Sequence, residues 1–365
     1  MVRGLDFNGK YLSASPTGVH RVAHELIAAL ARRGACDGAR ILAPRDILRR
    51  PDYGNIPIVS GGIFTWQFWE QLTLPWRSRG RMLVSLCNLA PLARHQAITM
   101  VHDAQVYLTP KSYDLAFRAW YRLVLPLIGH RHRRVLTVSD YSREQLVRAG
   151  VAPRERITVI HNGVDHILAT PSEPEVVSRL GLEKGRFAVA LSNLQAHKNV
   201  SLLLRVFADP ALAGLTLVLV GAADEAAFRA AGHAVPDNIV FAGKVSDGEL
   251  RGLMEVAGCL AFPSTTEGFG LPPLEAMRLG CPAVVAPCGA LPEVCGDAVL
   301  YAAPDDPAAW VEAIAKLCLD PETHRHYSEH GRRHASQFTW DRAAAKLEAV
   351  IAEVSATQHR MLAAA

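Results

Sequence analysis

Two carboxylates stand at the ends of a short segment rich in glycine and proline, Glu267-Gly-Phe-Gly-Leu-Pro-Pro-Leu-Glu275. Glycines let backbone N–H groups approach an anion closely, and a helix that begins at the prolines adds partial positive charge at its N-terminus. The segment therefore suits a diphosphate. Because carboxylates repel phosphate oxygens, we expect Glu267 and Glu275 to accept hydrogen bonds from sugar hydroxyls, one from a ribose and the other from a hexose. The spacing alone is explained equally well by a segment without a ligand, in which a Gly-rich loop starts an ordinary helix and both glutamates are solvated.

The flanking sequence predicts the elements that position this segment. The apolar run 259–262 predicts a buried strand that stops at Pro263, and 283–286 predicts the next strand. Between them, the two prolines fit the first turn of a helix, where a missing N–H costs little, and Gly280 fits its left-handed C-terminal cap. The segment is thus the loop of a βαβ unit, at the carboxyl end of a sheet.

A second candidate for anion binding is Lys198, in the segment Ser192-Asn-Leu-Gln-Ala-His-Lys-Asn199. The segment follows a strand predicted over 187–191, and Lys198 is predicted to start a helix. The helix dipole disfavours a cation at that position, so an anion is needed to balance it. A diphosphate supplies that anion.

The Glu267–Glu275 segment resembles the Glu-x7-Glu signature of the retaining glycosyltransferases of family 4, which have the GT-B fold. The glycines, the prolines and both acids fall in register with that signature. The resemblance implies that Glu267 lies near the donor hexose and that Glu275 binds the nucleotide ribose. It also implies a loop that holds the donor diphosphate, made of Gly268 and the amides of Phe269, Gly270 and Leu271.

Further positions in the second half of the chain carry the same resemblance. In the family, a lysine at the position of Lys198 acts with an arginine to neutralise the leaving nucleoside diphosphate. This chain has His197 where arginine is common and Ser192 where some members place a second arginine, so less fixed positive charge meets the leaving group. His197 is expected to become protonated when phosphate is bound. Backbone atoms around Val245 are expected to read the base edge.

In the first half of the chain the resemblance is looser. It implies that Gly18, after the first predicted strand, contacts the donor phosphates from the opposite domain. His102 and Asp103 follow a strand predicted over 97–101, where the family keeps an active-site histidine. We expect this pair to bind a sugar hydroxyl or to orient the acceptor, although a lone histidine is more often structural.

The alternation of predicted strands and helices in two halves indicates an α/β protein with two doubly wound Rossmann-like domains that face a central cleft. Residues 1–170, which begin with a strand predicted over 2–7, are expected to form an acceptor-binding domain. Residues 171–340 are expected to bind the nucleotide sugar. A last helix at about 341–360 is expected to pack back on the first domain.

Composition restricts the class of protein further. The 365 residues carry a formal net charge of only +4, which does not argue for a nucleic-acid partner. The seven cysteines are scattered, as is usual for reduced thiols in the cytoplasm. The start of the chain lacks a signal-peptide pattern, and no apolar run approaches the ~18 residues of a membrane span. We expect a cytoplasmic protein.

Two segments combine aromatic or apolar residues with clustered bases, 66–81 and 118–134. Such segments suit peripheral contact with an anionic membrane, here the inner face of the cell membrane. A core helix with a solvated basic end would give the same pattern, so both interpretations stay open.

Together these features predict a retaining hexosyltransferase that uses no cofactor and, because no Asp-x-Asp motif is present, no metal. The resemblance favours mannose from GDP-mannose as donor, with UDP-sugars next. It favours a glycan or polyprenyl-diphosphate-linked glycan as acceptor, in the synthesis of a cell-surface polysaccharide such as lipopolysaccharide. The alternatives are a sugar-nucleotide epimerase on the same fold and a non-catalytic sugar-nucleotide-binding subunit of a polysaccharide assembly complex.

Overall fold

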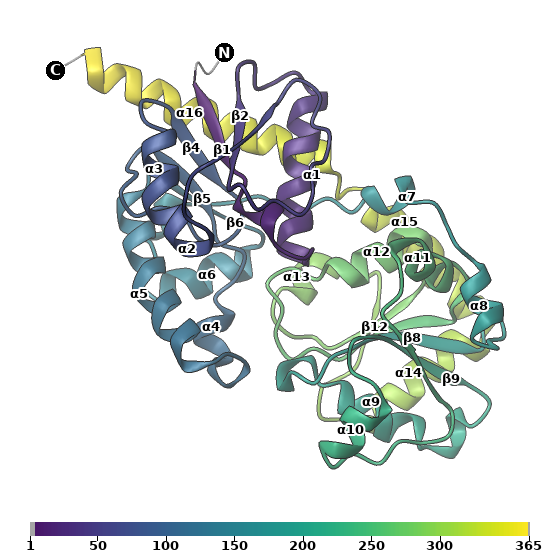
Figure 1. Ribbon diagram of the computed structural model, residues 1–365. Coiled ribbons are helices and arrows are strands. Elements are labelled where there is room, and N and C mark those ends of the chain that lie inside the picture. The colour runs from purple at the N-terminus through teal and green to yellow at the C-terminus, as the bar shows by residue number, and fades with distance from the viewer. Residues whose placement is uncertain (1–3, 364–365) are drawn as a thin grey trace. The chain divides into compact units, whose positions relative to one another are not determined.

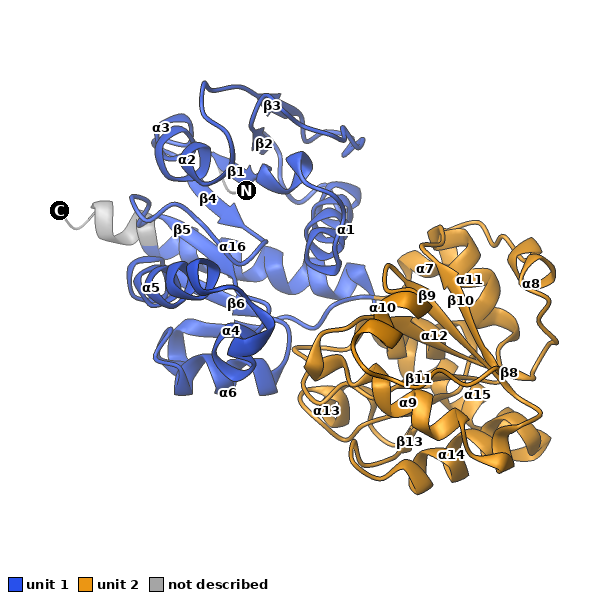
Figure 2. Ribbon diagram, turned by 60° about the horizontal axis from the view of Figure 1, so that its bottom comes forward, with its two compact units in different colours: residues 1–163, 339–365 blue, residues 164–338 orange. Residues whose placement is uncertain are grey.

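The computed structural model describes the backbone of residues 4–363 and the side chains of residues 4–357. The chain forms two compact units, which Figure 2 distinguishes by colour: unit 1 holds residues 1–163 and 339–365, and unit 2 holds residues 164–338. The boundary expected at residue 170 falls within unit 2. Val2 and Arg3, in the first predicted strand, lie outside the described residues.

Unit 1 is built on a seven-stranded sheet in the order β3-β2-β1-β4-β5-β6-β7, and all its pairings are parallel (Figure 1). Its strands are β1 (Leu5–Asn8), β2 (Arg40–Ala43), β3 (Ile58–Ser60), β4 (Met82–Ser85), β5 (Ala97–Met100), β6 (Arg134–Thr137) and β7 (Ile157–Val159). The strand order reverses between β1 and β4, and ligands of doubly wound sheets bind beyond the carboxyl ends of the strands at such a reversal.

The helices of unit 1 lie between these strands in the chain, except for the last one, which follows unit 2. They are α1 (Gly18–Arg32), α2 (Trp66–Phe68), α3 (Leu74–Arg77), α4 (Gln105–Leu108), α5 (Leu115–Arg131), α6 (Asp140–Arg148) and α16 (Trp340–Ala363). Helix α16 returns to unit 1 and packs against α1, whose buried face includes Val22, Leu26 and Leu30. A Cβ atom on Gly163 would lie 2.2 Å from the backbone N of Trp340, so only glycine lets the two parts of unit 1 meet here.

Unit 2 has a six-stranded parallel sheet in the order β10-β9-β8-β11-β12-β13. Its strands are β8 (Phe187–Ser192), β9 (Thr216–Gly221), β10 (Ile239–Gly243), β11 (Cys259–Phe262), β12 (Ala283–Val285) and β13 (Leu300–Tyr301). Its helices are α7 (His166–Ala169), α8 (Glu175–Arg179), α9 (Val200–Phe207), α10 (Glu225–Ala230), α11 (Asp247–Val256), α12 (Leu271–Leu279), α13 (Leu291–Cys295), α14 (Pro307–Leu319) and α15 (Pro321–Ala335). Two parallel Rossmann-like sheets confirm the predicted fold class.

The two segments for which membrane contact was considered, 66–81 and 118–134, both contain helices. Between α2 and α3 the chain forms a π-helix, Trp69–Thr73, and Trp69 is buried with its Nε1 donating to the carbonyl of Gly61 at 2.7 Å. Trp69 is therefore not available to a membrane. In the second segment α5 ends at Arg131, and the following basic residues lead into β6. None of the described helices is both long and apolar enough to cross a membrane.

Candidate functional site

Unit 2 contains a cavity of about 520 Å³ at the carboxyl edge of its sheet. Its lining includes residues at the carboxyl ends of four strands. Ser192, Gly221 and Phe262 are the last residues of β8, β9 and β11, and Lys244 directly follows β10. They meet because the carboxyl ends of parallel strands lie on one edge of a sheet. The volume is typical of a site for a small organic molecule.

Lys198 and Glu267 form an ion pair on the wall of this cavity. The Nζ of Lys198 lies 2.7 Å from Oε1 of Glu267, and Glu267 is only 8% exposed. The same Nζ lies 6.0 Å from the centroid of the Phe262 ring. A cation and an acid thus stand together where a phosphate and a sugar could bind side by side.

The prediction that Lys198 starts a helix was wrong. Lys198 ends a 3-10 turn, Ala196–Lys198, and α9 begins two residues later, after Asn199 adopts a left-handed conformation at φ +52°. The turn is tied to the glycine-rich loop, because Thr265 donates its backbone N–H to the carbonyl of His197 at 2.8 Å. This bond joins the Lys198 segment to the Glu267 segment without a helix.

The backbone of Glu267 is fixed by a close approach to Gly289. A Cβ atom on Gly289, whose φ is +63°, would lie 2.5 Å from the backbone N of Glu267. The neighbouring Ala290 N–H donates to the carbonyl of Glu267 at 3.0 Å. Any side chain at residue 289 would displace the acid from the cavity wall.

The predicted helix after the glycine-rich loop is confirmed, with Gly270 before its first turn and Gly280 as its left-handed C-terminal cap. Phe269 is buried, and its ring meets that of Phe338 edge-on at 6.1 Å, so this side chain serves packing. The amides of Gly270 and Leu271 lie at the N-terminus of α12, where helix amides and dipole favour an anion.

Glu275 has different neighbours from Glu267. It is 9% exposed, and its Oε1 lies 3.0 Å from Nε2 of His166, a residue of α7, which packs on α12. Of the described residues, Glu275 is not among those that line the cavity, whereas Pro272 in the same helix is. Sequence reasoning missed His166; its only signal was its place directly after the turn Asn162-Gly-Val-Asp165.

The remaining candidates in unit 2 lie at or near the cavity. Ser192 lines it, and its hydroxyl donates to the carbonyl of Ala223. His197 is buried, and burial together with nearby Lys198 lowers the pKa of its imidazole. Val245 lines the cavity beside Lys244, which adds a second cation to its wall.

The candidates in unit 1 lie at the carboxyl edge of its own sheet. Gly18 opens α1, where Thr17 caps the helix. His102 is buried with Nε2 2.8 Å from the carbonyl of Leu86, and burial lowers its pKa to about 4, so the ring is neutral at pH 7. Asp103 accepts a hydrogen bond from the backbone N of Gln105, the first residue of α4, at 2.9 Å.

A polar cluster beyond the end of β1 was not predicted. Glu70 is buried, accepts from Asn8 Nδ2 at 2.7 Å, and pairs with Lys10 Nζ at 2.6 Å. Lys10 also donates to Gln67 at 3.0 Å. The partners are some sixty positions apart in sequence, so no local pattern could have indicated them.

Comparison with known proteins agrees with this architecture. A family model described as "Glycosyl transferases group 1" matches residues 173–334, and one described as "Glycosyltransferase Family 4" matches residues 16–167. The O-antigen chain mannosyltransferase RfbU of Salmonella typhimurium is 27% identical over 279 residues, 74% of this chain and 74% of that protein. The O-antigen chain mannosyltransferase B of Escherichia coli is 29% identical, over 69% of this chain and 68% of that protein.

Among solved structures, Anabaena HepE in complex with UDP-glucose superposes with a TM-score of 0.71 at 20% identity, covering 97% of this chain and 99% of that one. This likeness shows the fold. With the two family models and the mannosyltransferase relatives, it establishes that the chain belongs to the family 4 glycosyltransferases of the GT-B fold.

Proposed function

We propose that this protein transfers a hexose, with retention of configuration, from a nucleoside-diphosphate sugar to a hydroxyl group of a glycan. The observation that carries the proposal is the Lys198–Glu267 pair on the wall of the unit 2 cavity. The ammonium group suits the donor diphosphate, and the carboxylate suits hydroxyls of the transferred sugar. Retention without a carboxylate nucleophile implies that the leaving phosphate takes the acceptor proton on the same face of the sugar.

The proposal needs neither a divalent metal nor a cofactor. The negative charge of the diphosphate would be balanced by Lys198 and Lys244 and by the amides at the N-terminus of α12. Transfer should therefore persist in excess EDTA.

For the donor we propose GDP-mannose, because the two O-antigen relatives are named as mannosyltransferases. UDP-sugars are the next choice, since the structurally similar HepE binds UDP-glucose. The acceptor would be a glycan or a polyprenyl-diphosphate-linked glycan, and the product a cell-surface polysaccharide such as the O-antigen of lipopolysaccharide. In this scheme unit 2 binds the donor and unit 1 the acceptor, which would meet Lys10, His102 and Asp103.

Glu275→Ala should weaken nucleotide binding. If its carboxylate accepts hydrogen bonds from the ribose hydroxyls, losing it should raise the dissociation constant about 10- to 100-fold. The thermal shift of the full chain with GDP and with UDP measures this, because a ligand that binds only the folded state raises stability with its affinity. Glu183→Ala, which removes an exposed acid of unit 2, is the matched control.

Two outcomes would contradict the assignment. Unchanged nucleotide affinity in Glu275→Ala would remove the ribose role. A chain that binds GDP or UDP but transfers no sugar to any glycan would be a non-catalytic binding subunit, and one that converts the donor sugar into an epimer would be an epimerase.

We also propose peripheral contact between unit 1 and an anionic membrane at the cytoplasmic face. Trp66, Phe68 and Trp76, which we call the aromatic patch, are 70%, 70% and 74% exposed. Large aromatic side chains are rarely left in water on a protein surface without a partner, and they favour the membrane interface. Lipid-linked acceptors would be reached from this position.

Replacing all three residues of the aromatic patch with alanine should reduce binding to phosphatidylglycerol-containing vesicles at least tenfold, measured by flotation at low and high salt. Because the side chains are exposed, the melting temperature should change little. Leu319→Ala removes an exposed apolar side chain of unit 2 and is the control. Equal flotation of the triple variant and the unaltered chain would remove the membrane proposal.

A further inference from the structure

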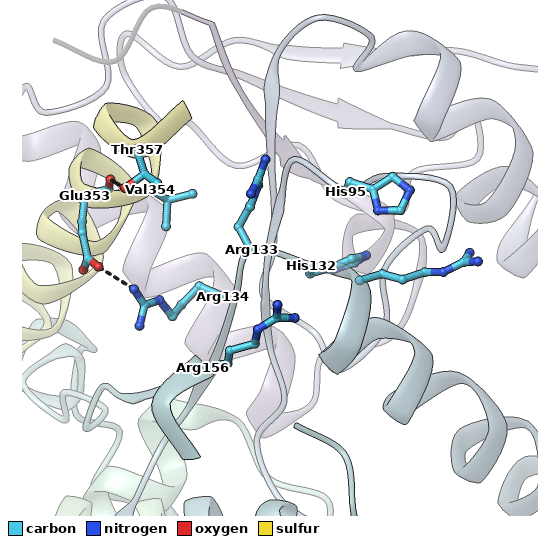
Figure 3. A pocket seen from close by; sticks show the side chains of 9 residues that line it. His95, His132, Arg133, Arg134, Arg156, Glu353, Val354 and Thr357 are labelled. Carbon is cyan, nitrogen blue, oxygen red and sulfur yellow. Dashed lines mark hydrogen bonds and ion pairs between the residues drawn. The ribbon is translucent and has the colours of Figure 1, made fainter. Parts of the chain in front are cut away.

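Besides the cavity of unit 2, the protein has a cavity of about 400 Å³ in unit 1, at the amino edge of its sheet (Figure 3). His102 and Lys10 lie beyond the carboxyl ends of β5 and β1, at the opposite edge of the same sheet. The cavity is therefore distinct from the candidate acceptor site. We call it the arginine pocket; its charged lining consists of Arg131, Arg133, Arg134, Arg156 and Glu353, and His95 lies beside them.

The strand order of the sheet brings these basic residues close together. The strands β5, β6 and β7 are parallel neighbours, so the residues just before each strand meet at one edge. His95 precedes β5, the three arginines 131, 133 and 134 precede or begin β6, and Arg156 precedes β7. Helix α16 completes the wall with Glu353, Val354 and Thr357.

Cationic groups outnumber anionic ones among the described residues of this lining. Four arginines and a single carboxylate, that of Glu353, line the pocket, and Glu353 is paired with Arg134 at 2.5 Å (Figure 3). The dipole of α5 explains a cation at Arg131, the last residue of that helix. It does not explain the arginines at residues 133 and 156, which lie beyond the helix.

Two of the arginines donate hydrogen bonds to backbone carbonyls. Arg156 Nη1 donates to the carbonyl of His130 at 2.7 Å, and Arg131 Nη1 lies 3.5 Å from that of Leu92. A guanidinium group has five N–H donors, so one such bond fixes the side chain and leaves capacity for a ligand. Planar guanidinium groups bind phosphate oxygens in pairs of parallel hydrogen bonds.

The floor of the pocket includes His132, a buried residue whose two ring nitrogens meet Thr99 Oγ1 at 2.7 Å and the carbonyl of Pro91 at 3.3 Å. Because the carbonyl can only accept, Nε2 donates this bond. Burial is the main reason that the pKa of His132 is lowered to about 4; nearby His95, Arg131 and Arg94 also lower it, and the hydrogen bond to the Pro91 carbonyl opposes them, so the ring is neutral at pH 7. The neighbouring cations make protonation of this ring unfavourable, and a bound anion would offset their effect.

We propose that the arginine pocket binds a phosphate group, carried either by a free phosphate compound or by the headgroup of an anionic lipid. The pocket belongs to unit 1, whereas the donor cavity belongs to unit 2, and the inference does not rest on the proposed transfer reaction. A lipid headgroup here would fix unit 1 on the membrane surface, whereas a free phosphate compound would regulate or stabilise unit 1.

The test follows the side-chain resonances of His95 and His132 in the full chain labelled with ¹⁵N-histidine, assigned with the variants His95→Gln and His132→Gln. Inorganic phosphate is titrated at constant ionic strength and, separately, vesicles of phosphatidylcholine with or without phosphatidylglycerol are added. We expect saturable shifts of these two histidines. Phosphate bound in the unit 2 cavity would shift the resonance of His197 instead.

The double variant Arg133→Gln/Arg156→Gln should weaken the interaction at least tenfold, because each guanidinium contributes charge-assisted hydrogen bonds. The residues at 133 and 156 are exposed, so the fold should tolerate glutamine, and an unchanged melting temperature checks this. Arg148→Gln, at an exposed arginine of α6, is the matched control.

The outcomes separate the two sources of phosphate. Saturable, variant-sensitive shifts with inorganic phosphate support a free phosphate ligand. Variant-sensitive binding only to vesicles that contain phosphatidylglycerol supports a lipid headgroup. If neither probe gives saturable binding, or if the double variant binds as the unaltered chain does, the arginine pocket is not a phosphate site.

Discussion

Lys198→Ala is expected to lower turnover about 10²- to 10³-fold, which is the usual effect of removing one group that stabilises developing negative charge. As the glycosidic bond breaks, charge accumulates on the leaving diphosphate, and an ammonium group nearby stabilises that state more than the bound donor. Nζ is 2.7 Å from Oε1 of Glu267, so donor binding must exchange or share this ion pair. The loss in donor affinity should therefore be much smaller than the loss in turnover.

Initial rates of sugar transfer at several donor concentrations separate the two effects, because a group that acts only in the transition state changes kcat and kcat/KM equally. Lys184→Ala, at an exposed lysine of unit 2, controls for the change in net charge. If Lys198→Ala raised KM alone, the ammonium would be a binding group, and if neither constant changed, the assignment of this cavity to the donor would fail.

Most of the fold could be predicted because its strands are short apolar runs bounded by glycine, proline or polar residues. The strand at 259–262 was predicted to the residue, and the helix that follows the glycine-rich loop ends at the predicted cap, Gly280. The edge strands were harder. The strand β3 is half-exposed and lacks an apolar run, and β13 is only two residues long. Their positions are set by pairing with β2 and β12, which the local sequence does not encode.

The candidate site was predictable to the extent that it lies in one segment of chain. The loop from Glu267 to Leu271 and the cap at Gly280 follow from residue types alone, since glycine and proline restrict the backbone in known ways. Contacts between segments were not predictable. The pairs Lys198–Glu267, His166–Glu275 and Lys10–Glu70 join residues far apart in sequence, and only the folded sheet brings them together.

His102 makes the stability of unit 1 sensitive to acid. Burial lowers its pKa from 6.5 to about 4, so between these values the unfolded chain binds a proton that the folded chain does not. Stability therefore falls as the pH decreases from 6.5 to 4 and is fully present above 6.5. This difference in the pKa of His102 between the unfolded and folded chain lowers the free energy of unfolding at pH 4 by about 3 kcal/mol relative to its value above pH 6.5.

The variant His102→Gln has no imidazole to protonate at this position, so comparing it with the unaltered chain gives the contribution of His102 to the acid sensitivity. At pH 7 the variant should be less stable, because it disturbs the buried bond to the Leu86 carbonyl, but the difference should shrink or reverse as the pH falls toward 4. Urea unfolding followed by tryptophan fluorescence measures it, since only Trp310 of the six tryptophans lies outside unit 1. His132 has a similarly low pKa, so the variant should retain part of the acid sensitivity. A constant difference between the variant and the unaltered chain from pH 7 to pH 4 would mean that His102 is protonated equally in the folded and unfolded states.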